Sequence, residues 1–243
     1  MTSYNYLSLF GKNNKGIAVL IDPDKSKDLN DLMNVIRHCE SAKIDYLFIG
    51  GSTGTREEFQ YTVNFIKTNC TIPLIIFPGS PKQLSPQADA ILFLSLISGR
   101  NPYYLIESQI ESAEDIAEMK LNVIPTSYLL IDGGTNSSVA YVSQTTPIPS
   151  TRHAIIYKTA LAGSFLGHKA TYLDAGSGAK TSVPVAAVRM ISEIGTTVIV
   201  GGGIKSIDQI KDYHEAGASI VVIGNHIESH PDFLMEIKEY KLV

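Results

Sequence analysis

The stretch "YLDAGSGAK", residues 172–180, is an apolar run that stops on a carboxylate and passes through two glycines before a helical pattern begins. A strand that turns at once into a helix is typical of a βα unit in a parallel sheet. Bare glycine backbone at such a turn also lets main-chain N–H groups bind an anion. Taken alone, however, the segment is better explained as a tight strand-to-helix turn.

The same alternation of short apolar runs and amphipathic stretches extends over the whole chain. Apolar runs predict eight strands, at residues 16–22, 45–50, 73–77, 90–95, 123–131, 170–174, 198–200 and 219–223. Amphipathic stretches predict seven helices, at residues 29–41, 56–68, 103–119, 151–166, 183–194, 207–216 and 231–240. Eight βα units in 243 residues indicate one closed α/β barrel domain spanning residues 1–243.

One helix is missing from this count, between the third and fourth strands. The link there is "PGSPKQLSPQAD", residues 78–89, which has three prolines and no helical period. A parallel crossover usually contains a helix, so we expect a gap in the outer helical ring beside these strands. Such a gap offers an apolar slot that suits a long, thin, apolar ligand. The alternative is a disordered or merely extended surface loop.

Composition excludes several classes of protein. The net charge is −4 and the basic residues are scattered, which disfavours a nucleic-acid partner. The only cysteines, Cys39 and Cys70, lack metal-ligand spacing and indicate reduced core thiols of a cytoplasmic protein. No export signal and no apolar run of about 18 residues appears, so membrane insertion is not expected.

The first two predicted strands end in residues suited to a divalent cation. "IDPDK", residues 21–25, places Asp22 at a strand end, and Mg²⁺ prefers a few protein oxygens together with waters and phosphates. Ser52, in "IGGSTGT" (49–55), could add a hydroxyl at the same barrel mouth. We interpret Asp22 as the ligand; Asp24 or Ser26 would cap the following helix, or Asp24 would support the ligand from behind.

The last three predicted strands each end in a glycine-rich turn before a helix. The turns are "DAGSGA" (174–179), "VGGGIKS" (200–206) and "IGNHIES" (223–229), and together they indicate a phosphate cradle. Gly176 and Gly178 leave N–H groups free, while Asp174 would face the polar end of the ligand. Tyr172 points to the same side as Asp174 by the two-residue period of a strand. The six histidines are interpreted as structural.

A set of motifs in a fixed order resembles the geranylgeranylglyceryl phosphate synthase family over nearly the whole chain. The motifs are "IDPDK", "GGS", "FPG", "SLISGRNP", "YLDAGSGA", "GGGI" and "GN". The resemblance implies a modified TIM (βα)8 barrel that lacks the helix between strands three and four. It also implies Mg²⁺-dependent transfer of a prenyl group, with geranylgeranyl the first expectation, from its diphosphate to the sn-3 hydroxyl of sn-glycerol 1-phosphate, with release of pyrophosphate.

The resemblance also assigns residues and assembly. Asp22 and Ser52 correspond to the Mg²⁺ site. The glycerol-phosphate site corresponds to Tyr172, Leu173, Asp174, Ala175, Gly176, Ser177, Gly178, Gly202, Gly203, Gly224 and Asn225. We expect Asp174 to accept the proton of the glycerol hydroxyl and Tyr172 to assist. The family forms homo-oligomers, so we expect a dimer or a hexamer.

Two other functions remain open. One is a different phosphate-binding barrel enzyme, such as an isomerase or aldolase, although Asp132 is the only further strand-end acid beside Asp22 and Asp174. The other is a non-catalytic protein that binds lipid phosphates.

Overall fold

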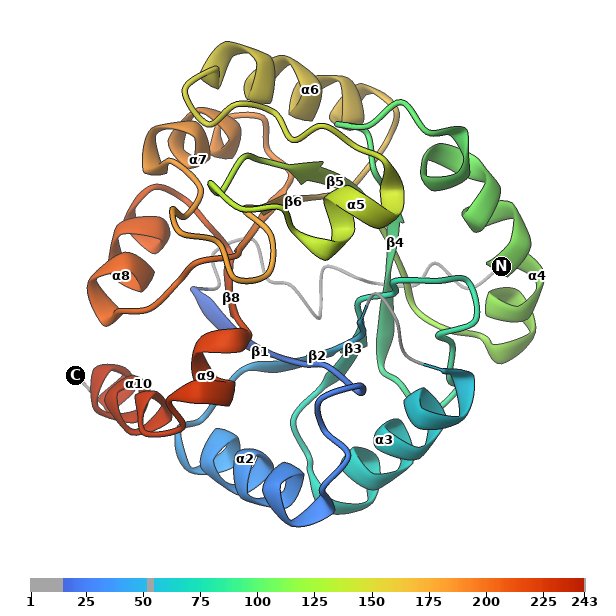
Figure 1. Cartoon of the computed structure of the whole chain (residues 1–243), viewed down its shortest axis with the longest axis vertical. Coiled ribbons are helices and arrows are strands. Elements are labelled where there is room, and N and C mark those ends of the chain that lie inside the picture. Colours follow the sequence, from blue (N-terminus) through green and yellow to red (C-terminus); the bar gives the residue numbers. More distant parts are fainter. Residues whose placement is uncertain (1–14, 52–54, 243) are drawn as a thin grey trace.

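The structure is a closed barrel of eight parallel strands (Figure 1). It is a computed structural model that describes residues 15–51 and 55–242. Each strand pairs with the next along the chain, and the last pairs with the first. The strands are β1 (Gly16–Ile21), β2 (Tyr46–Ile49), β3 (Leu74–Ile76), β4 (Ala90–Ser95), β5 (Val123–Leu130), β6 (Ala170–Asp174), β7 (Thr197–Gly201) and β8 (Ile220–Ile223). All eight predicted strands are therefore confirmed, with ends shifted by a residue or two.

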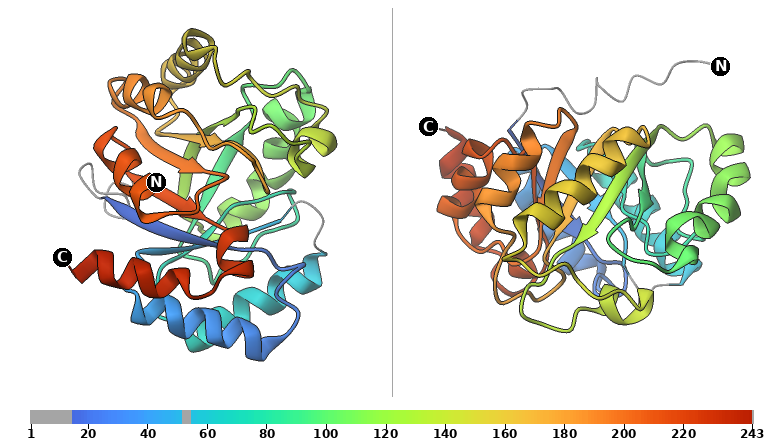
Figure 2. Two further views of the ribbon diagram at one scale, coloured as in Figure 1. Left: turned by 60° about the vertical axis from the view of Figure 1, so that its left-hand side comes forward. Right: turned by 90° about the horizontal axis from the view of Figure 1, so that it is seen from above.

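Helices surround the barrel, as both views in Figure 2 show. The helices are α2 (Leu29–Ser41), α3 (Arg56–Asn69), the π-helix η1 (Tyr103–Glu107), α4 (Ser108–Met119), α5 (Ser138–Ser143), α6 (His153–Phe165), α7 (Val185–Ser192), α8 (Ile207–Glu215), α9 (Asn225–Ser229) and α10 (Phe233–Leu242). None in the described part of the chain is long and apolar enough to cross a membrane.

Three helical features depart from the sequence prediction. The helix predicted at 103–119 begins with the π-helical turn η1 before it becomes α4. The short helices α5 and α9 were not predicted, because six and five residues are too few to show a 3.6-residue period. The helix after β1 is capped by Asp28, whose carboxylate accepts the N–H groups of Asn30 and Asp31. The predicted cap at Asp24 or Ser26 is therefore wrong.

Strand side chains divide into two apolar layers. Tyr172 and Phe48 point into the barrel interior, whereas Leu173 and Leu129 lie in the layer between the strands and the helices. This division follows from the two-residue period of a strand. Among the strand residues, only those that point inward at the carboxyl ends can face a ligand at the barrel mouth; the turns that follow the strands supply the rest.

The link between β3 and β4 contains turns and no helix, which confirms the predicted gap in the ring. Around the barrel, α3 is followed directly by the η1–α4 pair (Figure 1). The loop is not a loose one, since Gln83 is buried within it. The Gln83 side chain accepts the N–H of Gly79 at 2.8 Å and donates to the carbonyl of Gly51 at 2.9 Å. The loop is thereby fastened to the turn after β2.

Candidate active site

A cavity of about 540 Å³ opens at the carboxyl ends of the strands. Ten of the residues predicted for the site line it: Asp22, Tyr172, Asp174, Gly176, Ser177, Gly178, Gly202, Gly203, Gly224 and Asn225. The barrel thus brings the acid of the first strand and the glycine turns of the last three strands around one space. Ser52 lies outside the described residues.

Leu173 and Ala175 are the predicted site residues that do not line the cavity. Their side chains are buried in the layer between the strands and the helices. The backbone N–H of Ala175 is already bonded to the carbonyl of Gly201 at 3.1 Å. The prediction that these two residues contact the ligand is therefore wrong for their side chains, because alternate residues of a strand face opposite sides.

Asp22 forms the wall of the cavity at the end of β1. Its carboxylate accepts the N–H of Asp24 at 3.1 Å and lies 3.9 Å from the ammonium of Lys25. Gly51 packs so closely on it that a Cβ there would lie 2.3 Å from Oδ1. Burial raises the pKa of Asp22, against the lowering effects of the Asp24 N–H and Lys25. A bound divalent cation would favour the ionised form of this carboxylate.

The donor set around Asp22 is small. No group of three or more histidine, cysteine, aspartate or glutamate side chains that could hold a metal occurs in residues 15–51 and 55–242. A fully protein-ligated site, such as structural zinc needs, does not fit. One carboxylate on the wall of an open cavity fits Mg²⁺, which keeps waters and takes phosphate oxygens from its substrates.

The opposite wall is built from glycines with left-handed backbone. Gly202 has φ +84°, and a Cβ there would lie 2.8 Å from the backbone nitrogens of Ala175 and Gly176 and from the Asp174 carboxylate. Only glycine allows the β7 turn to approach the β6 turn this closely. The result is a wall of main-chain atoms, which is the usual way in which barrel enzymes hold a phosphate.

A chain of side-chain contacts joins the two walls. The Lys25 ammonium donates to Asn225 Oδ1 at 3.2 Å and to Glu228 at 2.9 Å. Asn225 Nδ2 donates in turn to the hydroxyl of Ser177 at 2.8 Å. Since Lys25 also lies within 4 Å of Asp22, the β1 acid and the β8 and β6 turns are immediate neighbours.

Asp174 lies at the end of β6, between these walls and the barrel interior. Its Oδ2 accepts the hydroxyl of Tyr128 at 2.5 Å, and its Oδ1 accepts the N–H of Gly176 at 2.8 Å. Burial raises the pKa of Asp174, whereas these two hydrogen bonds lower it. Burial, followed by the charge of Asp174, raises the pKa of Tyr172 well above its ordinary value, so its phenol stays protonated at neutral pH.

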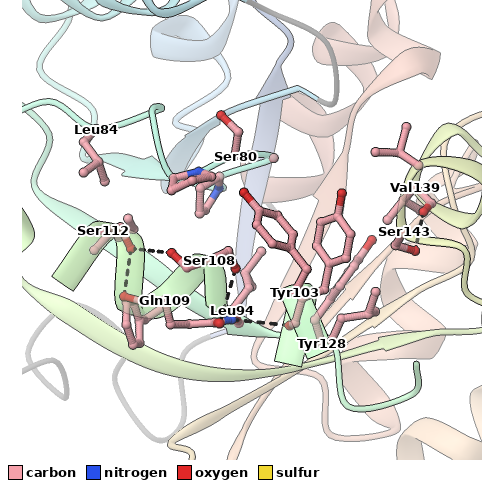
Figure 3. A pocket seen from close by; sticks show the side chains of 18 residues that line it. Ser80, Leu84, Leu94, Tyr103, Ser108, Gln109, Ser112, Tyr128, Val139 and Ser143 are labelled. Carbon is pink, nitrogen blue, oxygen red and sulfur yellow. Dashed lines mark hydrogen bonds between the residues drawn. The ribbon is translucent and has the colours of Figure 1, made fainter. Parts of the chain in front are cut away.

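An apolar pocket adjoins the cavity beside β4, at the place of the missing helix. We call it the slot; Pro78, Gly79, Leu94, Tyr128 and Val139 line both it and the cavity. The slot runs from these residues to Leu84, Ile91 and Ser112. Figure 3 shows Gln109 and Ser112 on one side of the slot and Val139 and Ser143 on the other. The slot expected from the loop length is therefore present.

Several residues around the cavity were missed by sequence reasoning. Tyr128 carries no local signal, because it lies inside an apolar run that predicts only a strand. Lys205 on the β7 turn and His226 and His230 on the β8 turn also line the cavity. The four-residue spacing of the two histidines in "HIESH" (226–230) is the signal that could have found them, since it puts both on one side of a helical turn.

Comparison with known proteins shows what the chain is similar to. The PcrB family matches residues 12–241. Geranylgeranylglyceryl phosphate synthase of Chitinophaga pinensis is 43% identical over 96% of this chain and 94% of its own, and that of Korarchaeum cryptofilum is 38% identical over 93% and 92%. The crystal structure of (S)-3-O-geranylgeranylglyceryl phosphate synthase from Thermoplasma acidophilum, in complex with sn-glycerol-1-phosphate, superposes with a TM-score of 0.89 at 31% identity, over 98% of this chain and 96% of that one. The chain therefore belongs to the PcrB family, together with relatives named geranylgeranylglyceryl phosphate synthase.

Proposed function

We propose that the protein is a prenyltransferase that joins a prenyl diphosphate to the sn-3 hydroxyl of sn-glycerol 1-phosphate and releases pyrophosphate. The observation that carries the proposal is the junction at Tyr128, where the apolar slot meets a cavity that has an acid on one wall and a glycine cradle on the other. A ligand with an apolar tail and a ligand with a phosphate fit on the two sides of this junction.

The acceptor is assigned to the glycine wall. Gly178, Gly202 and Gly203, all with positive φ, would hold the phosphate, with Ser177 and Asn225 beside them. The N–H of Gly176, expected to be free, is already bonded to the carboxylate of Asp174. The Thermoplasma acidophilum relative, solved with sn-glycerol-1-phosphate, supports this acceptor. Anchoring the phosphate would place the far hydroxyl toward Asp174, so that proximity supplies much of the rate.

The donor is assigned to the slot and to the Asp22 wall. An apolar tail in the slot gains about 25 cal/mol for each Å² removed from water. The names of the relatives make geranylgeranyl the first choice of tail, and a longer prenyl chain is the second. Mg²⁺, when bound, supplies positive charge for the leaving diphosphate, and Asp22 and Ser52 are its proposed protein ligands.

In the proposed reaction the glycerol oxygen forms a bond to the first carbon of the prenyl chain. The bond from that carbon to the diphosphate breaks, and its electron pair leaves on pyrophosphate. The hydroxyl proton passes to the carboxylate of Asp174, while protonated Tyr172 orients the hydroxyl oxygen.

The test is incubation of the purified protein with labelled sn-glycerol 1-phosphate, Mg²⁺ and geranyl, farnesyl, geranylgeranyl or longer prenyl diphosphates. The expected result is a labelled ether together with pyrophosphate. The control acceptor is sn-glycerol 3-phosphate, which has the same charge and the opposite configuration. Binding of both ligands without pyrophosphate release would indicate the non-catalytic alternative. No binding of any prenyl diphosphate would favour an isomerase or aldolase.

We also propose that the protein is a cytoplasmic homo-oligomer, either a dimer or a hexamer. The free, buried thiols of Cys39 and Cys70 support a reducing compartment. Phe165 and Leu166, at the end of α6, are 81% and 73% exposed, which supports a subunit contact there. Light scattering on the purified protein, compared with a Phe165→Ser variant, tests the assembly.

A further inference from the structure

Tyr128 is one of the five residues that line both pockets of the site. It lies on β5, is buried, and lines both the slot and the cavity. Two rings hold it edge-on, Phe77 with centroids 5.8 Å apart at 78° and Tyr172 with centroids 5.6 Å apart at 74°. Aromatic neighbours on two sides leave the phenol little freedom to turn.

The Tyr128 hydroxyl is aimed at Asp174 by the register of the sheet. Tyr128 pairs with Tyr172 across the β5–β6 ladder, and Asp174 lies two residues farther along β6. The side chain of Tyr128 is long enough to reach the carboxylate of Asp174, and its hydroxyl donates to Oδ2 of that carboxylate at 2.5 Å. Since Gly176 N–H binds Oδ1, both oxygens of the carboxylate are fixed in place.

The acidities of Tyr128 and Asp174 set the direction of the hydrogen bond between them. Burial, together with the charge of Asp174, raises the pKa of Tyr128 well above its ordinary value, so the phenol donates and the carboxylate accepts. The charge of Asp174 acts on two neighbouring phenols, Tyr128 from β5 and Tyr172 from its own strand, and β7 presents glycines to it. The hydrogen bonds that lower the pKa of Asp174 within residues 15–51 and 55–242 come from Tyr128 and Gly176, so its ionised form depends on these donors.

We propose that Tyr128 is a positioning residue, which holds the Asp174 carboxylate ionised and pointed at the junction of the slot and the cavity. The inference rests on the proposed function, because it gives Asp174 its acceptor role there. Tyr128 itself transfers no proton in this scheme. It holds the carboxylate of Asp174, the proposed proton acceptor, close to the first carbon of a prenyl chain bound in the slot.

The first test is Tyr128→Phe, with Tyr213→Phe as the matched control. Tyr213 is another buried tyrosine, whose hydroxyl donates to the carbonyl of Val183 at 2.6 Å away from the cavity. In Tyr128→Phe, kcat should fall at least about tenfold, while the KM for sn-glycerol 1-phosphate changes little. The acid limb of the pH profile of kcat should move to higher pH, because the ionised carboxylate has lost a donor. Tyr213→Phe should leave the limb in place.

The second test does not depend on activity. Isotope-edited NMR of the aspartate carboxyl carbons, with the Asp174 signal assigned by Asp174→Asn, should show this group titrating at higher pH in Tyr128→Phe than in the wild type. If Tyr128→Phe does not fold, a ring-fluorinated tyrosine at position 128 keeps the shape and strengthens the donor, and the titration should then move to lower pH.

The failures of the two proposals can be told apart. An unchanged Asp174 titration in the variants overturns the positioning role, whether or not the wild type is active. A wild type that forms no ether with any donor overturns the proposed function, whatever the NMR titration shows.

Discussion

The ammonium of Lys25 lies 3.2 Å from the side-chain oxygen of Asn225, although the two residues are 200 positions apart in the chain. Lys25 belongs to the turn that carries Asp22, and Asn225 belongs to the glycine turns that would hold a phosphate. The contact places the turn after β1 directly beside the turn after β8 at the rim of the cavity. Three pairs of substitutions, the single variant Asp174→Asn, and a donor series with Ser112→Phe test what each part contributes.

Asp22→Ala should abolish Mg²⁺-dependent turnover, because it removes the only carboxylate proposed to hold the cation. Pyrophosphate release measured over a series of Mg²⁺ concentrations checks this. Asp208→Asn is the control, since it removes an exposed carboxylate on α8 outside the cavity. Full activity of Asp22→Ala at any Mg²⁺ concentration would remove Asp22 from the scheme.

Asp174→Asn should lower kcat by about 100-fold or more, since an amide cannot accept the hydroxyl proton. Binding of sn-glycerol 1-phosphate, measured by calorimetry, should persist because the glycine wall is intact. The pH dependence has a defined sign: activity of the wild type should be lost as the pH falls through the raised pKa of Asp174. An unchanged kcat in the variant would deny Asp174 the acceptor role.

Lys25→Met should raise the KM for the prenyl diphosphate by about tenfold, because a cation between two anions is lost. Glu228→Gln is the matched variant, since it removes the carboxylate that binds Lys25 at 2.9 Å and leaves the ammonium in place. Steady-state kinetics at low and high salt should show that the KM for the prenyl diphosphate depends less on salt in Lys25→Met than in the wild type or in Glu228→Gln. Equal KM values in both variants would argue that Lys25 serves only its ion pair.

Gly202→Ala should weaken binding of sn-glycerol 1-phosphate and destabilise the fold by about 2 kcal/mol or more, since the new Cβ meets three atoms of the β6 turn at 2.8 Å. Gly178→Ala adds the same kind of left-handed strain, φ +72°, but has no atom within 4 Å. Its cost should be about 1 kcal/mol. For both variants, calorimetry measures the affinity for sn-glycerol 1-phosphate and chemical denaturation measures the free energy of unfolding. Gly178→Ala reports the backbone strain alone, so the additional loss in Gly202→Ala reports the steric crowding.

Ser112→Phe should shorten the preferred donor, because Ser112 is a buried residue of α4 that lines the far part of the slot. We expect kcat/KM for geranylgeranyl diphosphate to fall at least about tenfold and that for geranyl diphosphate to fall less. A donor-length series measures both, and an unchanged KM for sn-glycerol 1-phosphate controls for folding. An equal loss for all donors would place the tail elsewhere.

The barrel and its gap could be predicted from sequence because their signals are local. Runs of β-branched residues, glycine turns at strand ends and a proline-rich link are each contained in about a dozen residues. The crowding at Gly202 is the physical reason for one of those glycines, and it also explains why the glycine pattern located the cavity.

The remaining parts of the site depend on contacts between distant segments. The hydrogen bond from Tyr128 to Asp174 requires the register of β5 on β6, which no single segment encodes. The motif around Asp174 predicts one continuous contact surface that includes Leu173 and Ala175, whereas in the structure alternate side chains turn away from the cavity. Lys25 and Asn225 could not be paired from sequence, since only closure of the barrel brings β1 beside β8.

The open link between β3 and β4 has a further consequence for stability. Ile91 and Phe93 lie on the outer face of β4, where a regular barrel would cover them with a helix, and here they line the slot. A long hydrocarbon in the slot would complete the outer wall that the polypeptide leaves unfinished. Donor chain length and resistance to heat should therefore rise together, so that melting temperature becomes a direct readout of which tail the protein has evolved to hold.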